Sequence, residues 1–155
     1  MRGKQAPKRD LLPDPKYNNI SVSRFINYIM KNGKKTVAEK IVYDCFESME
    51  KTMKKDGLEI FEQAIKNVAP QIEVRSKRIG GGNYQVPVEV RSSRRESLAF
   101  RWILNAVNAK KGKKTALKLA DELIEAYNNR GDAIKKKEDV YKMAQANRAF
   151  AHFVR

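Results

Sequence analysis

The sequence contains one cysteine, Cys45, and one histidine, His152, among its 155 residues. A single cysteine excludes a disulfide within the chain and any zinc site built from several thiolates. Acidic residues such as Glu39 and Asp44 stand among lysines at helical spacing, which is typical of pairing along a helix surface. Since no nucleophile–base pair is evident either, the sequence predicts no catalytic residues, no metal site, no cofactor and no small-molecule substrate. We expect a protein that is not an enzyme.

Long apolar runs are also missing. No stretch of about 18 apolar residues occurs, and the opening MRGKQAPKRD lacks the apolar core of a signal peptide. These features predict a soluble cytoplasmic protein that does not enter a membrane.

Acidic residues are scarce: 18 Asp and Glu stand against 33 Lys and Arg, for a formal net charge of +15. A small domain usually carries a net charge of about 2 to 8 in magnitude. A surplus of positive charge favours a polyanionic partner, because each Lys or Arg placed on a phosphate releases condensed counterions. The alternative is a protein that is basic without any such partner.

Residues 1–18 are expected to form a basic, extended N-terminal tail. Prolines at positions 7, 13 and 15 remove backbone donors and break helices. On a nucleic acid this segment could follow the phosphates; the alternative is a frayed terminus. Residues 19–155 are then the folded part.

Apolar residues at helical spacing predict about six helices. The first starts near Ser21 and ends at Asn32-Gly33, the second is long and ends at Gly57, and the third stops before Pro70. The fourth starts with a capping box, Ser93 and Glu96, and is apolar nearly all round, so it should be central. The fifth runs from Thr115 to about Asn129, and the last carries Val140 to Ala151.

Residues 71–91 change to the alternation of a strand. Tyr84, Val86, Val88 and Val90 alternate with polar residues or proline, and Ile72 and Val74 fit a partner strand. Pro87 cannot donate to a ladder, so its strand needs a free edge. A five-residue loop, 79–83, would gather the apolar side chains on one face. This register pairs Arg78 with Tyr84, Ser76 with Val86, Val74 with Val88, and Ile72 with Val90.

The predicted fold class is therefore mainly α. We expect a single helical domain of about six helices, with a protruding two-stranded antiparallel β-ribbon at about 71–91 between the third and fourth helices.

Two glycine-containing motifs invite comparison with nucleotide-binding loops. KNGKKTVA at 31–38 and KKGKKTAL at 110–117 lack the glycine of GxxxxGK[ST], since Tyr28 and Val107 stand where it is needed. Thr36 and Thr115 can instead cap the helices that follow, leaving positive helix ends beside lysines that suit a single phosphate. The alternative is a solvated turn. GGGN at 80–83 lacks the dinucleotide fingerprint and suits a tight ribbon tip.

Three segments resemble small-subunit ribosomal protein seven of bacterial type. They are NGKKTVAEKIVYDC at 32–45, KRIGGGNYQVPVEVRSSRRESLAFRWI at 77–103 and KKKEDVYKMAQANRAFAHF at 135–153. The resemblance implies a helical domain with a protruding ribbon that binds the 3′ major domain of small-subunit ribosomal RNA and starts assembly of the subunit head. It also implies that the ribbon and C-terminal region approach exit-site transfer RNA and the messenger path, and that ribosomal proteins nine and eleven are neighbours.

The resemblance also suggests site residues. Those expected on ribosomal RNA are basic: Lys4, Lys8, Arg9, Lys34, Lys35, Arg75, Lys77, Arg78, Arg91, Arg94, Arg95, Arg101, Lys110, Lys113 and Lys114. Those expected to face transfer and messenger RNA are Gly80, Gly81, Gly82, Asn83, Tyr84 and Arg148. Tyr84 would stack on a base or pack against its own ribbon.

Two other classes of function fit the composition. A DNA-compacting or regulatory protein would also use helix–turn–helix units with a basic ribbon, and a protein-only scaffold would bind little nucleic acid at moderate salt. Preference for folded RNA over duplex DNA discriminates among them.

Overall fold

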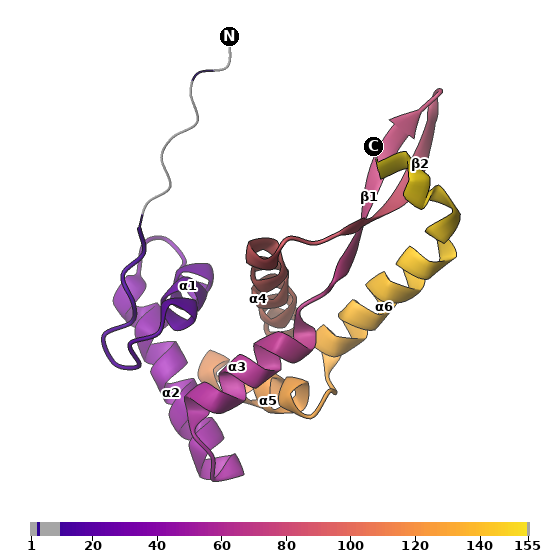
Figure 1. Ribbon diagram of the computed structural model, residues 1–155. Helices are drawn as coiled ribbons and strands as arrows, with labels where there is room; N and C mark the ends of the chain where they lie inside the picture. Colours follow the sequence, from indigo (N-terminus) through magenta and orange to yellow (C-terminus); the bar gives the residue numbers. More distant parts are fainter. Residues whose placement is uncertain (1–2, 4–9, 155) are drawn as a thin grey trace. The chain divides into compact units, whose positions relative to one another are not determined.

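The computed structural model describes residue 3 and residues 10–154, and the chain divides into two compact units, Met1–Lys40 and Ile41–Arg155. The described residues contain six α-helices, one 3-10 helix and one two-stranded sheet (Figure 1). The sheet lies between the third and fourth helices, so the mainly α fold with a ribbon at this position is confirmed. The boundary between a tail and a domain at residues 18 and 19 stays a prediction.

The first unit contains α1 (Ile20–Ile29), which the periodicity predicted. The side chain of Asn19 caps it by accepting hydrogen bonds from the backbone N–H of Ser21 and Val22. Val22, Phe25 and Ile26 are buried. The predicted end at Asn32-Gly33 is wrong by three residues: α1 ends at Ile29, Met30 is its C-cap, and Asn32 and Gly33, with φ of 54° and 73°, lie in the turn that follows.

A turn precedes α1, in the second half of the segment for which we expected an extended tail. Asp14 is buried and its carboxylate accepts hydrogen bonds from the N–H groups of Lys16 and Tyr17, each at 3.1 Å. Pro15 follows Asp14, an order that suits a β-turn. The extended conformation therefore does not hold for residues 14–18.

Helix α2 (Lys35–Met53) is followed by α3 (Gly57–Val68). The prediction that Gly57 ends α2 is wrong: Lys54, with φ 53°, follows the last helical residue, and Gly57 begins α3. A Cβ at Gly57 would lie 3.0 Å from Cβ of Phe46. Any larger residue at this position would therefore crowd the close packing between the two helices.

Helix α4 (Ser92–Ala109) is central in the second unit, as its apolar surface predicted. It contacts α3, α5 (Thr115–Tyr127) and α6 (Asp132–Ala146). A row of rings fills part of the core, with the centroids of Phe46 and Phe61 5.5 Å apart and those of Phe61 and Phe100 6.3 Å apart. Trp102, on the same helix, is half-buried.

The predicted helix caps are wrong. Arg91, not Ser93, is the N-cap of α4, and Lys114, not Thr115, is the N-cap of α5; neither makes a side-chain capping bond. Helix α2 starts at Lys35, which puts Thr36 inside the helix. Each helix begins one or two residues earlier than expected, so a hydroxyl meant for the cap lies within the first turn.

The ribbon consists of β1 (Ile72–Ile79) and β2 (Gly82–Glu89), paired antiparallel. Its predicted register is wrong by one residue, since Lys77, not Arg78, pairs with Tyr84. The loop has two residues in place of five, because Gly80 and Gly81 both adopt positive φ, 53° and 90°. Such a turn matches the twist of the strands and needs residues that tolerate positive φ.

The last predicted helix is two elements. Helix α6 ends at Ala146, Asn147 caps it, and a 3-10 helix, η1 (Arg148–Val154), follows. Within the second unit, η1 contacts β2 and α6 contacts β1, so the end of the chain lies beside the ribbon (Figure 1).

Candidate nucleic-acid interface

The ribbon presents positive charge along β1. Arg75, Lys77 and Arg78 are exposed on this strand, and Arg91 is exposed where the ribbon joins α4. The tip is narrow because Gly80 and Gly81 are exposed and carry no side chain, with Asn83 exposed beside them. A narrow, basic projection can approach a phosphate backbone closely. The structure thus brings together the ribbon residues that the sequence assigned to RNA.

Two of the predicted RNA-binding arginines bind a carboxylate at the foot of the ribbon. Glu73 is buried, and its Oε1 accepts a hydrogen bond from Nε of Arg75 at 2.6 Å. Nε of Arg94 donates to Oε2 of the same carboxylate at 2.8 Å. Nearby, Nε of Arg95 donates to the carbonyl of Val90 at 2.9 Å. The sequence did not reveal the role of Glu73, because a single acidic residue in a strand pattern looks like an ordinary solvent-exposed side chain.

Tyr84 packs against the C-terminal segment. Its ring centroid lies 5.2 Å from that of Phe150 and 5.8 Å from that of Phe153. Opposite Tyr84 on β1, Nζ of Lys77 donates to the carbonyl of Phe153 at 2.7 Å. Neither of the two alternatives considered for Tyr84 included these phenylalanines; the sequence placed Phe150 on the last helix and predicted no position for Phe153.

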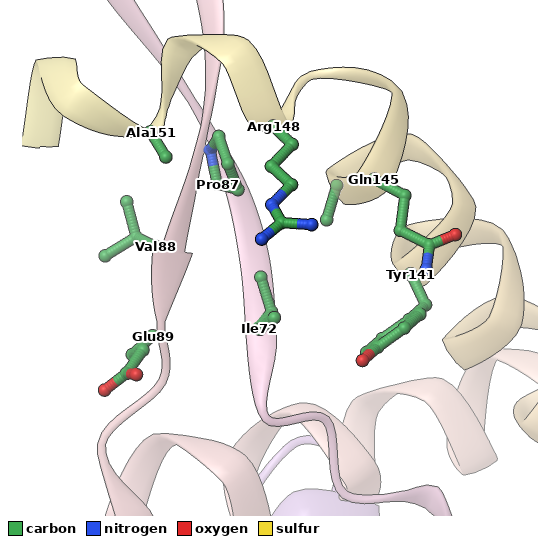
Figure 2. Close-up of a pocket in the computed structure, with 9 residues that line it drawn as sticks. Ile72, Pro87, Val88, Glu89, Tyr141, Gln145, Arg148 and Ala151 are labelled. Atoms are coloured by element: carbon green, nitrogen blue, oxygen red, sulfur yellow. The ribbon is translucent and has the colours of Figure 1, made fainter.

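A groove lies between the ribbon and the C-terminal elements, with a volume of about 360 Å³. Figure 2 shows the Arg148 side chain pointing into it, between the strand residues on one side and Tyr141 and Gln145 of α6 on the other. Its lining residues are Ile72, Pro87, Val88, Glu89, Tyr141, Ala144, Gln145, Arg148 and Ala151. We call this the ribbon groove. Most of its lining is apolar, and Arg148 brings a positive charge to it.

The turn between α4 and α5 carries the second GKKT motif, and its lysines differ in their surroundings. Nζ of Lys110 pairs with Glu122, which is fully buried, and with Glu125 at 3.0 Å. Burial alone would lower the pKa of Lys110, but hydrogen bonds to these two carboxylates outweigh it and raise the pKa. Lys113 pairs with Asp121 at 2.7 Å.

These pairs leave a basic hollow beside the turn, with a volume of about 660 Å³. It is lined by Thr52, Lys110, Lys111, Lys113, Lys118, Asp121, Ile124 and Glu125. Lys114 is exposed at the start of α5. The structure therefore brings together the lysines predicted at this turn, although Lys110 also neutralises the buried carboxylate of Glu122.

The remaining predicted residues lie elsewhere. In the first unit, Lys34 and Lys35 are exposed at the first GKKT turn, and Lys35 lies 3.8 Å from Glu39. Arg101 is exposed on α4 and its Nε donates to the carbonyl of Ser97. Lys4, Lys8 and Arg9 lie outside the described residues.

Metal centres and membrane spans are the two other kinds of site to consider in the described residues. Across residues 10–154 and residue 3, no group of three or more His, Cys, Asp or Glu side chains could hold a metal ion. None of the helices in that part of the chain combines the length and apolar character needed to span a bilayer.

Comparison with known proteins decides the family. The family model described as ribosomal protein S7p/S5e matches residues 1–148. The chain belongs to this family. The small ribosomal subunit protein uS7 of Thermotoga neapolitana is 55% identical over 153 residues, which cover 99% of each chain. That of Thermotoga maritima is also 55% identical with the same coverage, and that of Nitrosomonas europaea is 53% identical over 98% of this chain and 97% of its own.

As a member of the S7p/S5e family, the chain is a protein of the small ribosomal subunit, in the cytoplasm. Membership implies ribosomal RNA and other ribosomal proteins as partners, and RNA binding is expected throughout the family. The family consists of structural ribosomal proteins and is not an enzyme family.

Proposed function

We propose that this S7p/S5e protein binds the 3′ major (head) domain of small-subunit ribosomal RNA directly and starts assembly of the head. Its role is structural and not catalytic. The observation that carries the proposal is the ribbon, which presents Arg75, Lys77 and Arg78 along one strand and ends in a tip of two exposed glycines.

The mode of recognition is the shape of folded RNA. Double-helical RNA hides its major-groove edges, so a basic surface reads phosphate positions and 2′-hydroxyls. Further phosphate contacts would come from parts of the chain outside the ribbon. These are the exposed lysines Lys34 and Lys114 and the basic hollow beside the second GKKT turn. Within the second unit, the helices keep Lys114 and the hollow in fixed register with the ribbon.

The ribbon tip and the C-terminal segment are proposed to face exit-site transfer RNA and the messenger path. Asn83 at the tip and Arg148 in the ribbon groove are exposed and lie on elements that contact each other. The ring of Tyr84 packs against Phe150 and Phe153 of η1. We therefore assign contact with these RNAs to the tip and to Arg148 in preference to Tyr84.

Neighbouring ribosomal proteins nine and eleven are the protein partners proposed. Tyr141 and Met143 on α6 are 47% and 49% exposed. Apolar side chains exposed on one helix would suit a protein neighbour.

The test is filter binding of the chain to a fragment of the ribosomal RNA head domain and to length-matched duplex DNA, across a salt series. Tight RNA binding at salt concentrations that abolish DNA binding is expected. Replacing a phosphate-contacting residue, such as Arg78 by Gln, should reduce the salt slope by about one. Equal loss of affinity for both nucleic acids would contradict recognition of RNA shape and indicate binding by charge alone.

A further inference from the structure

Glu73 is a buried charge in a ribbon that is otherwise largely exposed. Glu73 itself is 7% exposed. On the same strand, residues 75–78 are all exposed. Burial of a carboxylate is unfavourable unless it is paired and hydrogen-bonded. Its position therefore requires the two arginines that bind it.

The arginines come from two different elements. Arg75 lies on the same strand, two residues further, and Arg94 lies in the first turn of α4, 21 residues away in sequence. Nε of Arg94 lies 3.0 Å from Oε1 and 2.8 Å from Oε2, so both oxygens face one guanidinium. The carboxylate thus joins β1 to the start of α4.

Two further bonds lie at the same place. The carbonyl of Val90 accepts from Nε of Arg95, and the N–H of Val90 donates to the carbonyl of Gln71, each at 2.9 Å. A two-stranded ribbon is marginally stable by itself, so its direction depends on contacts with other elements, which are α6 and η1 beside it and these bonds at its foot. The Glu73–Arg94 pair links β1 directly to α4 through charged side chains with directional geometry.

We propose that Glu73 is a positioning residue, which holds the ribbon in one direction relative to α4 by binding Arg94 and Arg75 and thereby sets the affinity for RNA. The inference rests on the proposed RNA-binding function. It changes the interpretation of Arg94 in particular: this residue acts through Glu73 and not through a phosphate.

The first experiment measures the direction of the ribbon without RNA. Spin labels at Asn83→Cys, on the tip, and Lys66→Cys, on α3, report one distance distribution by pulsed electron resonance; both sites are exposed. Cys45 is buried and stays unlabelled. The distribution should be narrow in the parent chain and broader with Glu73→Gln.

Glu89→Gln is the matched control. Glu89 is exposed on β2, is adjacent to the pairing partner of Glu73, and its replacement changes the net charge by the same amount. This variant should keep the narrow distribution. Circular dichroism of each variant verifies that the helices are retained.

The second experiment measures affinity for the ribosomal RNA fragment across salt. If Glu73→Gln leaves the ribbon in the bound direction for about a fifth of the time, Kd rises about fivefold relative to Glu89→Gln. The salt slopes of the two variants should be equal, because no phosphate contact is removed. A purely structural role in folding would lower thermal stability without broadening the distance distribution.

The outcomes separate the inference from the proposed function. Equal distributions for Glu73→Gln and Glu89→Gln would overturn the positioning role, whatever the RNA result. A broadened distribution with unchanged Kd would overturn its link to affinity. If the parent chain bound no RNA in the filter assay, the proposed function would fail, and the distance measurement would still decide whether Glu73 holds the ribbon.

Discussion

Lys110 offers a sharp test of whether the lysines at the second turn serve RNA binding or folding. Its Nζ pairs with Glu122, which is 0% exposed, and the carboxylate also accepts from the N–H of Ala133 at 3.0 Å. Lys110→Met would keep an unbranched side chain one atom shorter but leave this carboxylate without its cation. Loss of one partner of a buried ion pair costs about 3–5 kcal/mol.

The side chain of Lys110 is 26% exposed, so water reaches the pair and reduces this cost. We expect the free energy of unfolding to fall by about 2–3 kcal/mol after this correction. For a chain of this size about 2–4 °C is lost per kcal/mol, so Tm should fall by about 4–12 °C. Thermal melting followed by circular dichroism measures the shift.

Lys113→Met is the control. Lys113 pairs with Asp121 nearby, but both side chains are exposed, 61% and 46%, and such pairs contribute less than about 1 kcal/mol. Its Tm should therefore change by no more than about 4 °C. Equal destabilisation by the two substitutions would refute the reasoning, because exposure would then not govern the cost.

Two further predictions follow from contacts of Lys110 and Phe153. Because the folded-state pKa of Lys110 is raised, its contribution to stability is fully present below about pH 10.5, the ordinary lysine pKa, and is lost as pH rises through the higher folded-state pKa. Urea unfolding at rising alkaline pH should therefore show the difference between the parent and Lys110→Met shrinking; a constant difference contradicts the assignment. Phe153→Ala removes the contact with Tyr84, worth about 0.5–1.5 kcal/mol, and should speed amide exchange in η1 by about 2- to 12-fold, with no change in α4. Unchanged exchange would mean that the rings do not hold the segment.

The sequence predicted the presence and approximate position of the helices, because the side of each helix that is buried carries apolar residues at helical spacing. Helix α1 lies where the period predicted it, with the positive-φ residues Asn32 and Gly33 in the turn after it, and α4 contacts three other helices as its apolar surface required. The exact starts of α4 and α5 were missed, because Ser93 and Thr115 are favoured N-caps by propensity, whereas each helix starts one or two residues earlier, with Arg91 and Lys114 as the N-caps.

The register of the ribbon was wrong for a different reason. We chose the pairing that gathered apolar side chains on one face, which is a sound criterion for a strand on a core. This ribbon is largely exposed, so the turn decides instead: Gly80 and Gly81 fit a two-residue turn, and that turn fixes Ile79 opposite Gly82.

The residue types of the candidate site could be predicted from the sequence, but the hydrogen bonds and ion pairs among its side chains could not. The residue types and the ribbon predicted which cations lie together on the ribbon and at the second GKKT turn, and their contact with RNA stays a prediction. The partners of those cations could not be read from the sequence, because Glu73 and Arg94 are 21 residues apart and Lys77 contacts a carbonyl 76 residues away. Such pairs depend on how the elements pack.

Trp102 is the only tryptophan in the chain, and it lies half-buried on α4, in the second unit. Its fluorescence, excited at long wavelength, therefore reports one unit alone, whereas far-ultraviolet circular dichroism reports the helices of both. Coincident urea transitions by the two signals would indicate that the units melt as one cooperative body, and separate transitions would indicate independent melting. The native chain thus carries its own optical reporter of cooperativity, with no label to be introduced.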